Sequence, residues 1–223
     1  MAESARSWPF DPQDRPTKIV CVGKNYALHA KEMGSEVPRH PVVFLKPPSA
    51  LIPDGADIRI PTEAGEVHHE VELGVIVGKR LSRASVEAAP GAIGGWCLAI
   101  DVTAREMQTA AKQKGHPWAV AKGFDTFCPV SRPLPATAVD PRTATIELDV
   151  SGEPRQAART GDMVWSVPEL LSYISSVMTL EPGDLVLTGS PEGVGPLVPG
   201  DSVEARLDGA VLLRHHVVAR VPL

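Results

Sequence analysis

Prolines and glycines interrupt this sequence so often that long helices have little room to form. The 223 residues include 22 prolines and 19 glycines. Proline lacks the backbone N–H that a helix interior needs, and glycine favours turns. The stretches between them include short apolar runs at 19–22, 42–45 and 185–187, which predict strands. We therefore expect a mostly-β, mixed α+β fold in which a few short helices accompany many short strands.

Helices are predicted at four places. Two begin with a capping box, in which a Ser or Thr is followed three residues later by Glu, at 103–106 and 166–169. The first of these helices is expected to cover 104–114, and further helices are expected at 24–34 and 82–90. The helix that follows 166–169 is expected to bury an apolar stripe made of Leu170, Leu171, Ile174, Val177 and Met178.

The stretch from Gly65 to Gly74, with the sequence GEVHHEVELG, combines strand character with closely spaced acids. Side chains alternate along a strand, so His68, Glu70 and Glu72 share one face, and the two glutamate Cα atoms lie roughly 6.5 to 7 Å apart. Two carboxylates in one buried space are unfavourable unless a cation or a proton compensates them. Oxygen ligands favour Mg²⁺, Mn²⁺ or Ca²⁺ over zinc. The alternative is an edge strand with a solvated acidic face.

Asp101 ends a second apolar strand, and a carboxylate at such a position is a candidate third metal ligand. Arg105 and Gln108 follow it on the predicted helix, three residues apart and therefore on the same face. If Asp101 faces a metal, both side chains can reach an anionic ligand beside that metal. The alternative is that both are solvated.

A histidine and a glutamate pair three residues apart suggests a general base. His29 and Glu32 share a face of the predicted helix, and a carboxylate beside an imidazole orients it and raises its basicity. A surface ion pair is the alternative. Lys46 ends the apolar strand at 41–45. Its side chain can point into a site or reach solvent, and we expect it to reach solvent. The three glycines of 188–196 let backbone N–H groups approach a ligand, but the loop lacks the lysine and spacing of a nucleotide-binding P-loop.

Charge and composition exclude several kinds of partner. The net charge is −5, the pI is near 5.8, and no Lys/Arg run is present. Nucleic acid and anionic membranes are therefore not expected as partners, and a small molecule is the expected partner.

The three cysteines are far apart and predict core residues in a reducing compartment. The N-terminus lacks an apolar stretch of signal-peptide length, which predicts a cytoplasmic protein. We expect a polar surface arm at 1–16 and a single catalytic domain at 17–223.

Five motifs together resemble the fumarylacetoacetate hydrolase family. They are HHEVELG at 68–74, D-x-T-A-R-E-x-Q at 101–108, AKGFD at 121–125, LTGSPEGVGP at 187–196 and VGKNYALHAKEMG at 22–34. The last is similar to the short, single-domain branch that contains acylpyruvases and enzymes acting on oxaloacetate. The resemblance extends over nearly the whole chain from about residue 17, and the order and spacing of the motifs make it specific.

The resemblance implies a mixed β-sandwich roll, a homodimer and one divalent ion per subunit, Mg²⁺ or Mn²⁺, with Ca²⁺ also compatible. It also implies roles for individual residues. The metal ligands would be Glu70, Glu72 and Asp101, the catalytic residues His29, Glu32 and Lys122, and the substrate contacts Arg105, Gln108 and Thr188.

The activity implied first is hydrolysis of the C–C bond of 2,4-dioxo acids, such as acylpyruvates and fumarylpyruvate, to pyruvate and a carboxylate. His29, oriented by Glu32, would deprotonate the attacking water, and Lys122 would neutralise developing negative charge. The same site could instead act as an oxaloacetate tautomerase or decarboxylase, for which no attacking water is needed. A third alternative is a non-catalytic, metal-dependent 2-oxo acid binding protein, and a purely structural role for the acids is a fourth.

Overall fold

Three sheets make up the fold of the computed structural model, which describes residues 15–34 and 36–220. Most neighbouring strands are antiparallel, with parallel pairs at β1·β13, β3·β9 and β4·β16. The largest sheet has the order β2 (Val42–Lys46), β1 (Ile19–Gly23), β13 (Leu185–Leu187), β6 (Val71–Val77), β7 (Ile93–Ile100), β9 (Cys128–Val130) and β3 (Leu51–Pro53), with β10 (Leu134–Pro135) beside β7.

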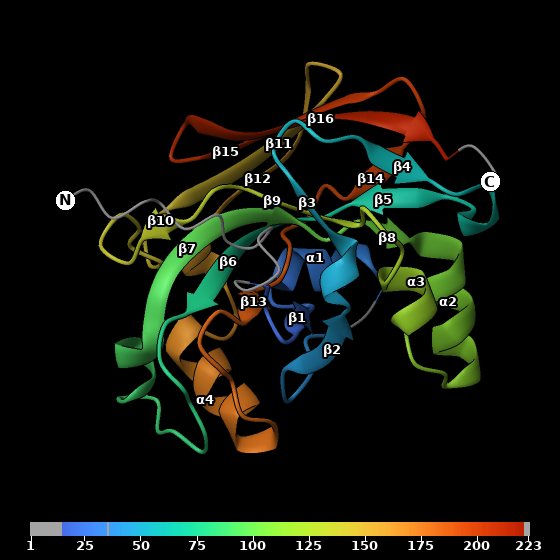
Figure 1. Ribbon diagram of the computed structural model, residues 1–223. Coiled ribbons are helices and arrows are strands. Elements are labelled where there is room, and N and C mark those ends of the chain that lie inside the picture. The colour runs from blue at the N-terminus through green and yellow to red at the C-terminus, as the bar shows by residue number, and fades with distance from the viewer. Residues whose placement is uncertain (1–14, 35, 221–223) are drawn as a thin grey trace.

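The other two sheets are smaller. The five-stranded sheet has the order β12 (Glu153–Arg159), β11 (Thr145–Val150), β15 (Ser202–Leu207), β16 (Ala210–Ala219) and β4 (Ile58–Ile60). The three-stranded sheet has the order β14 (Gly195–Leu197), β5 (Val67–His69) and β8 (Thr103–Ala104). Figure 1 shows β11, β12, β15 and β16 as a layer over the curved strands β6 and β7. This arrangement confirms the predicted mostly-β, mixed fold.

The described helices are short, as the density of prolines and glycines predicts. They are α1 (Ala27–Glu32), α2 (Arg105–Lys114), α3 (Ala119–Lys122) and α4 (Val167–Val177). In Figure 1, α2 and α3 lie side by side at one edge of the molecule and α4 lies beside β6 and β7. None of these described helices is long and apolar enough to cross a membrane.

Apolar side chains from the two larger sheets form the main core between them. Val71, Leu73 and Val75 of β6 belong to the same buried cluster as Ile146 and Leu148 of β11. The opposite face of β6 carries Glu72 and then Gly74, where the Cys97 side chain fills the space that a Cβ would need. The strand therefore buries apolar side chains on one face and presents an acid on the other.

Two of the helix predictions need correction. Residues 82–88 form turns rather than a helix, and only Ala89–Ala92 forms a 3-10 turn, because this polar segment has no apolar stripe to bury. Helix α2 begins at Arg105 with Ala104 as its N-cap and no side-chain cap. The Thr103 hydroxyl instead donates to the carbonyl of Asp101, so the capping box predicted there is wrong.

The capping box of α4 is confirmed, with Ser166 and Glu169 bonded to each other's backbone or side chain. Leu170, Leu171 and Ile174 are buried as predicted, but Val177 is 66% exposed and Met178 is half-buried. The apolar stripe leaves the core at these two residues because α4 ends at Val177. Helix α1 is also shorter than predicted, ending at Glu32 before the left-handed Gly34.

The predicted surface arm and the three cysteines are the remaining features predicted from the sequence. The predicted surface arm at 1–16 lies almost wholly outside the described residues; of its last two residues, Arg15 is exposed and Pro16 is buried. Cys21, Cys97 and Cys128 are free and buried, as expected of core cysteines.

Candidate active site

Glu70, the first glutamate of the acidic motif, lies where the chain passes from one sheet to another. Strand β5 ends at His69 and β6 begins at Val71, so Glu70 lies between a small sheet and the large one. Its carbonyl accepts the N–H of Asp101, which follows β7 directly. Glu72 lies on β6, two residues further along. Pairing of β6 with β7 therefore brings all three acids to the same end of these two central strands.

The three acids form a compact buried group, called here the acid floor. Glu70, Glu72 and Asp101 are 6%, 1% and 0% exposed. One carboxylate oxygen from each lies within 4.8 Å of the others. The convergence of Glu70 and Glu72 expected from strand alternation is therefore present in the structure, with Asp101 as the third member.

Cations surround two members of the acid floor. The ammonium of Lys122, at the end of α3, lies 2.9 Å from Glu70 Oε2, 2.5 Å from Asp101 Oδ2 and 2.6 Å from the Thr103 hydroxyl. The Arg105 guanidinium donates to the other oxygen of Glu70. Burial alone would raise the pKa of Glu70, but Lys122 and Arg105 hold it well below its usual value. Asp101 and Glu70 raise the pKa of Lys122 against the effect of its burial.

The Lys46 side chain is buried beside the acid floor, where the sequence had led us to expect exposure to solvent. The expectation that it reaches solvent is incorrect, because its side chain is buried and its ammonium lies 2.8 Å from Asp101 Oδ1. It also donates to the carbonyls of Val102 and Lys122, at 2.9 and 2.6 Å. A buried ammonium with three oxygen partners is satisfied, so β2 ends in the site rather than at the surface.

Glu72 is the one acid of the floor that no described cation pairs with. Its Oε2 accepts the N–H of Gly189 at 2.6 Å. Burial, followed by the charges of Asp101 and Glu70, raises the pKa of Glu72 well above its usual value. Gly189 has a φ of 104°, and a Cβ there would lie 2.7 Å from the Cβ of Asn25, so this close approach requires glycine.

The chemistry of the donor set fits a divalent metal ion. Three buried carboxylates offer hard oxygen ligands at mutual distances that one ion can span. The uncompensated charge of Glu72 supplies the electrostatic reason, because a buried carboxylate needs a cation or a proton.

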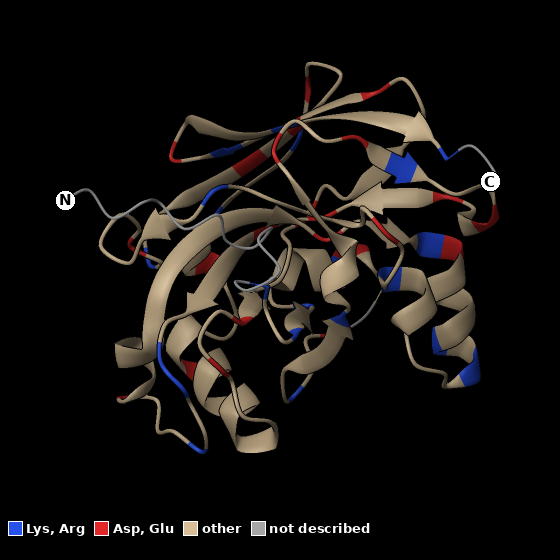
Figure 2. Cartoon of the chain, in the orientation of Figure 1, with Lys and Arg blue, Asp and Glu red and all other residues tan. Residues whose placement is uncertain are grey.

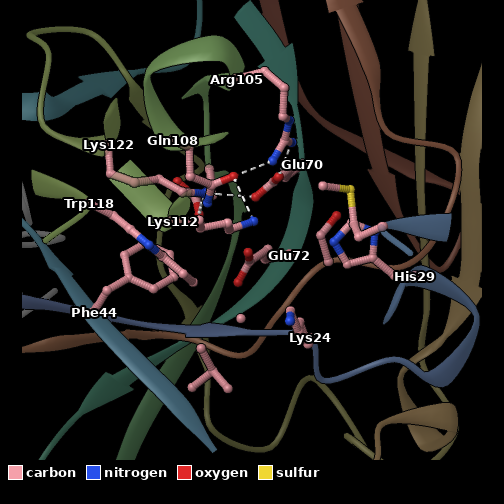
Figure 3. Close-up of a pocket in the computed structure, with 15 residues that line it drawn as sticks. Lys24, His29, Phe44, Glu70, Glu72, Arg105, Gln108, Lys112, Trp118 and Lys122 are labelled. Carbon is pink, nitrogen blue, oxygen red and sulfur yellow. Dashed lines mark hydrogen bonds and ion pairs between the residues drawn. The ribbon is translucent and has the colours of Figure 1, made fainter. Parts of the chain in front are cut away.

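Helix α1 places an imidazole beside the acid floor. His29 is buried, and its Nδ1 lies 3.2 Å from Glu32 Oε2, as the three-residue spacing predicts. The other Glu32 oxygen, Oε1, accepts the N–H of Gly193 at 3.1 Å. Figure 3 shows His29 on the side of the pocket away from Lys122, with Glu72 between them. His29 thus lines the pocket from a separate element, whereas Glu32 is not among the lining residues.

Of the three predicted substrate contacts, two line the pocket and Thr188 does not. Arg105 and Gln108 both line the pocket, and the Gln108 carbonyl oxygen accepts from Arg105 Nη1 at 2.6 Å and from Lys112 Nζ at 3.2 Å. Thr188 is fully buried and is not among the lining residues. Its hydroxyl donates to the carbonyl of Leu73 at 2.8 Å. The role predicted for Thr188 stays a prediction.

Several lining residues were missed by reasoning from the sequence. They come from the segment after β1, from the end of α1, from β2, from α2, from the turn before α3 and from residues 188–196, called here the glycine loop, so no local pattern joins them. They are Lys24, Met33, Phe44, Lys112, Trp118 and Ser190.

A buried glutamine connects the acid floor to the glycine loop. Gln156 Oε1 accepts from the Val71 N–H at 3.0 Å and lies 2.9 Å from His69 Nδ1. Its Nε2 donates to the Ser190 hydroxyl at 2.8 Å and to the carbonyl of Pro191 at 2.9 Å. Gln156 is the one buried residue of β12, whose other residues are mostly exposed, and no local sequence pattern indicates its partners.

Comparison with known proteins shows which family the chain resembles. The family model "Fumarylacetoacetate (FAA) hydrolase C-terminal" matches residues 18–218. The chain is 50% identical over 206 residues to the mitochondrial oxaloacetate tautomerase FAHD1 of Arabidopsis thaliana, covering 92% of each protein. It is 46% identical over 194 residues to the mitochondrial oxaloacetate decarboxylase of Dictyostelium discoideum, covering 86% of this chain and 89% of that protein.

A solved structure extends the comparison. The fumarylpyruvate hydrolase from Pseudomonas aeruginosa, in complex with Mn²⁺ and pyruvate, superposes with a TM-score of 0.88. Its sequence is 37% identical, and the match covers 92% of this chain and 91% of that one. With a family model that spans most of its length and relatives near half identity, the chain belongs to the fumarylacetoacetate hydrolase family.

Proposed function

We propose that this chain is a divalent-metal-dependent enzyme that interconverts the keto and enol forms of oxaloacetate. The observation that carries the proposal is the acid floor: three buried carboxylates within 4.8 Å, one without a cationic partner among the described residues, beside a buried imidazole. The similarity to an oxaloacetate tautomerase over 92% of both proteins supports the same reaction.

The metal ligands in this proposal are Glu70, Glu72 and Asp101. A divalent ion bound there supplies a Lewis acid that polarises the 2-oxo carbonyl, a contribution of several kcal/mol. We propose Mg²⁺ as the usual ion and Mn²⁺ as an effective substitute, because the donors are hard oxygens. The Mn²⁺ in the Pseudomonas aeruginosa structure supports the substitution.

His29 is the proposed base that moves the proton at C3 of the substrate. With Nδ1 directed at Glu32, the ring presents Nε2 to the pocket as the proton acceptor. The bond from Gly193 N–H to Glu32 fixes the carboxylate, which in turn fixes the ring. In the keto-to-enol direction His29 would take the proton from C3 and the resulting imidazolium would give it to the C2 oxygen, and the two transfers reverse in the other direction, so no water is consumed.

Three further side chains would stabilise charge. Lys122 holds a positive charge at the edge of the acid floor, where negative charge develops on the 2-oxo oxygen. Arg105 and Gln108 present donors on the same wall of the pocket, where the substrate carboxylate would lie. Lys46 pairs with Asp101 and holds it in place without lining the pocket itself.

Hydrolysis of acylpyruvates is the second candidate, and the paired His29 and Glu32 favour it. A base oriented by a carboxylate suits deprotonation of a water that attacks the distal carbonyl, which releases a carboxylate and pyruvate. The similarity to a fumarylpyruvate hydrolase supports this reading. Both reactions use the same polarised 2-oxo group and differ in whether water reaches the distal carbonyl.

One panel separates these functions. Metal-stripped protein is assayed with oxaloacetate, fumarylpyruvate and acetylpyruvate, with and without Mg²⁺ or Mn²⁺, by following enol absorbance and pyruvate separately. Metal-dependent loss of enol without pyruvate indicates tautomerisation, and pyruvate from oxaloacetate indicates decarboxylation. Pyruvate from a dioxo acid indicates hydrolysis. Binding of these acids without any turnover would contradict the enzyme proposal and leave the binding-protein alternative.

The proposal also includes a cytoplasmic homodimer. The dimer is carried over from the family resemblance, and the free, buried cysteines support a reducing compartment. Light scattering after size-exclusion chromatography tests the dimer, and a molar mass equal to that of one chain would contradict it.

A further inference from the structure

Two lysines in the pocket have no acidic partner among the described residues. Lys24 and Lys112 both line the pocket that contains the acid floor. The other lining cations, Arg105 and Lys122, each form an ion pair with Glu70. Figure 3 shows the ammonium groups of Lys24 and Lys112 directed into the space beside Glu72, from opposite sides. They are therefore free to bind an anion that enters the pocket.

The backbone at Lys24 has an unusual conformation. Its φ is 61°, in the left-handed region that residues other than glycine rarely adopt. The next residue, Asn25, is held by its side chain to Trp165 and Thr188. Unusual backbone conformations of this kind persist where the surroundings fix them, and they concentrate at ligand-binding positions.

The second lysine lies on α2 in a positive environment. Lys112 Nζ contacts Gln108 at 3.2 Å and lies 5.1 Å from the centroid of the Trp118 ring. Partial burial, followed by the charge of Arg105, lowers the pKa of Lys112 to about 8. Figure 2 shows that basic positions recur along α2. An anion beside Lys112 would relieve this repulsion.

The charges of the pocket favour a ligand with two negative groups. Lys46, Lys122 and Arg105 already pair with members of the acid floor. A divalent ion on the same acids would then add positive charge that one carboxylate, at the pyruvyl end of the substrate, only partly offsets. The described lining residues contain no acid outside the acid floor. Positive charge therefore remains for a second carboxylate.

We propose that Lys24 and Lys112 form a distal anion subsite that selects 2-oxo dicarboxylic acids over 2-oxo acids with an uncharged far end. This inference rests on the proposed function, because it assumes that the 2-oxo end of the ligand binds at the acid floor. Phe44 and Trp118 line the same space and contact the carbon chain between the two ends.

Binding of two matched probes tests the subsite without requiring turnover. The probes are 2-oxoglutarate and 2-oxopentanoate, which have the same number of carbons and differ only in a terminal carboxylate or methyl group. Calorimetry with Mn²⁺-loaded protein is expected to show that the parent binds 2-oxoglutarate at least about tenfold more tightly. The double variant Lys24→Met, Lys112→Met is expected to bind both equally, with its affinity for 2-oxopentanoate unchanged within about twofold.

The control is Lys114→Met, which removes an exposed lysine of α2 that does not line the pocket, and it is expected to keep the parental preference. The single variant Lys112→Met is expected to lose part of it, which keeps the test informative if the double variant does not fold. A parent that binds both probes equally, or a double variant with the parental preference, would overturn the subsite and leave the proposed function standing. A parent that binds neither probe would also overturn the subsite, and the oxaloacetate panel decides the proposed function separately.

Discussion

The acid floor and helix α1 hold functional groups in one pocket by different means. Glu70, Glu72 and Asp101 lie on or beside strands paired in the centre of the largest sheet, and ion pairs tie two of them to lysines and an arginine. Helix α1 has six residues, no side-chain N-cap, and a leucine, Leu28, that is 61% exposed. Regular sheet pairing positions the acids, whereas contacts at its two ends position the helix.

Those end contacts are few and specific. At the start of α1, the Asn25 side chain bonds to the backbone of Trp165 and Thr188. The backbone carbonyl of Asn25 accepts the N–H of Val164. At the other end, Glu32 accepts the N–H of Gly193. A short helix held at two points is easier to displace than a central strand. We therefore expect metal binding to depend on the acid floor and proton transfer to depend on α1.

The largest effect is expected for Glu72→Gln. Removal of this ligand should abolish detectable Mn²⁺ binding and reduce turnover to the metal-free background, because it removes the Lewis acid. The same variant should not destabilise the metal-free protein, since Glu72 is a buried carboxylate without a cationic partner among the described residues. Electron paramagnetic resonance of Mn²⁺ and thermal unfolding measure the two effects. A lower melting temperature would show that the Glu72 charge stabilises the fold.

His29→Ala is expected to reduce turnover without weakening metal binding, which distinguishes the role of α1 from that of the acid floor. Turnover should fall about 10²- to 10⁴-fold, because the proposed general base is lost. The affinity for Mn²⁺ should stay within about twofold, since His29 lies on α1 and not on the strands of the acid floor. Glu70→Ala serves as the opposite control, with metal binding lost. Equal loss of metal affinity in both variants would contradict the division between the regions.

An intermediate effect is expected for Gln156→Leu. This side chain bonds to Val71 on one side and to Ser190 and Pro191 on the other, so its loss should loosen the glycine loop that supplies Gly189 N–H to Glu72. Metal affinity should fall about tenfold to a hundredfold, as for other residues that position ligands. Stability should fall by about 1–3 kcal/mol, because the Val71 N–H loses its partner.

The matched control for Gln156 is Arg155→Gln, an exposed substitution on the same strand. It should leave both metal affinity and stability unchanged. If Gln156→Leu lowered stability but left the affinity for Mn²⁺ at the parental value, the glutamine would have a purely structural role.

The smallest effect is expected from pH. Partial burial, followed by the charge of Arg105, lowers the pKa of Lys112 to about 8. Lys24 and Lys122 lower it further, and the charge of Glu70 opposes them. The ammonium is therefore charged below this pH and neutral above it. The preference for 2-oxoglutarate over 2-oxopentanoate should decline as pH rises from 7 to 9, by up to about tenfold, and the decline should be reduced in Lys112→Met. A preference that does not vary with pH would contradict a contribution from this lysine.

The sequence predicted those parts of the fold and site that depend on local patterns. The alternation of 65–74 placed Glu70 and Glu72 on one face, and the spacing of His29 and Glu32 placed them in contact. The mostly-β class followed from the frequency of turns, and the family followed from five motifs.

The remaining features depend on long-range contacts. Lys46 pairs with an acid 55 positions away in the chain, and Gln156 bonds to residues of β6 and the glycine loop, so no local pattern indicates either partner. Thr103 satisfied the spacing of a capping box, but its hydroxyl bonds to Asp101 and Lys122 instead. In each case a tertiary partner outweighs the local preference.

The most direct test of the central claim is the rate of oxaloacetate keto–enol exchange as Mn²⁺ is titrated into metal-stripped protein. If the acid floor holds the ion that polarises the substrate, exchange starts at the non-enzymatic blank and rises to saturation at one Mn²⁺ per chain, and Glu72→Gln stays at the blank throughout. Full exchange by the stripped protein in the presence of a chelator, or parental exchange by Glu72→Gln, would contradict the claim.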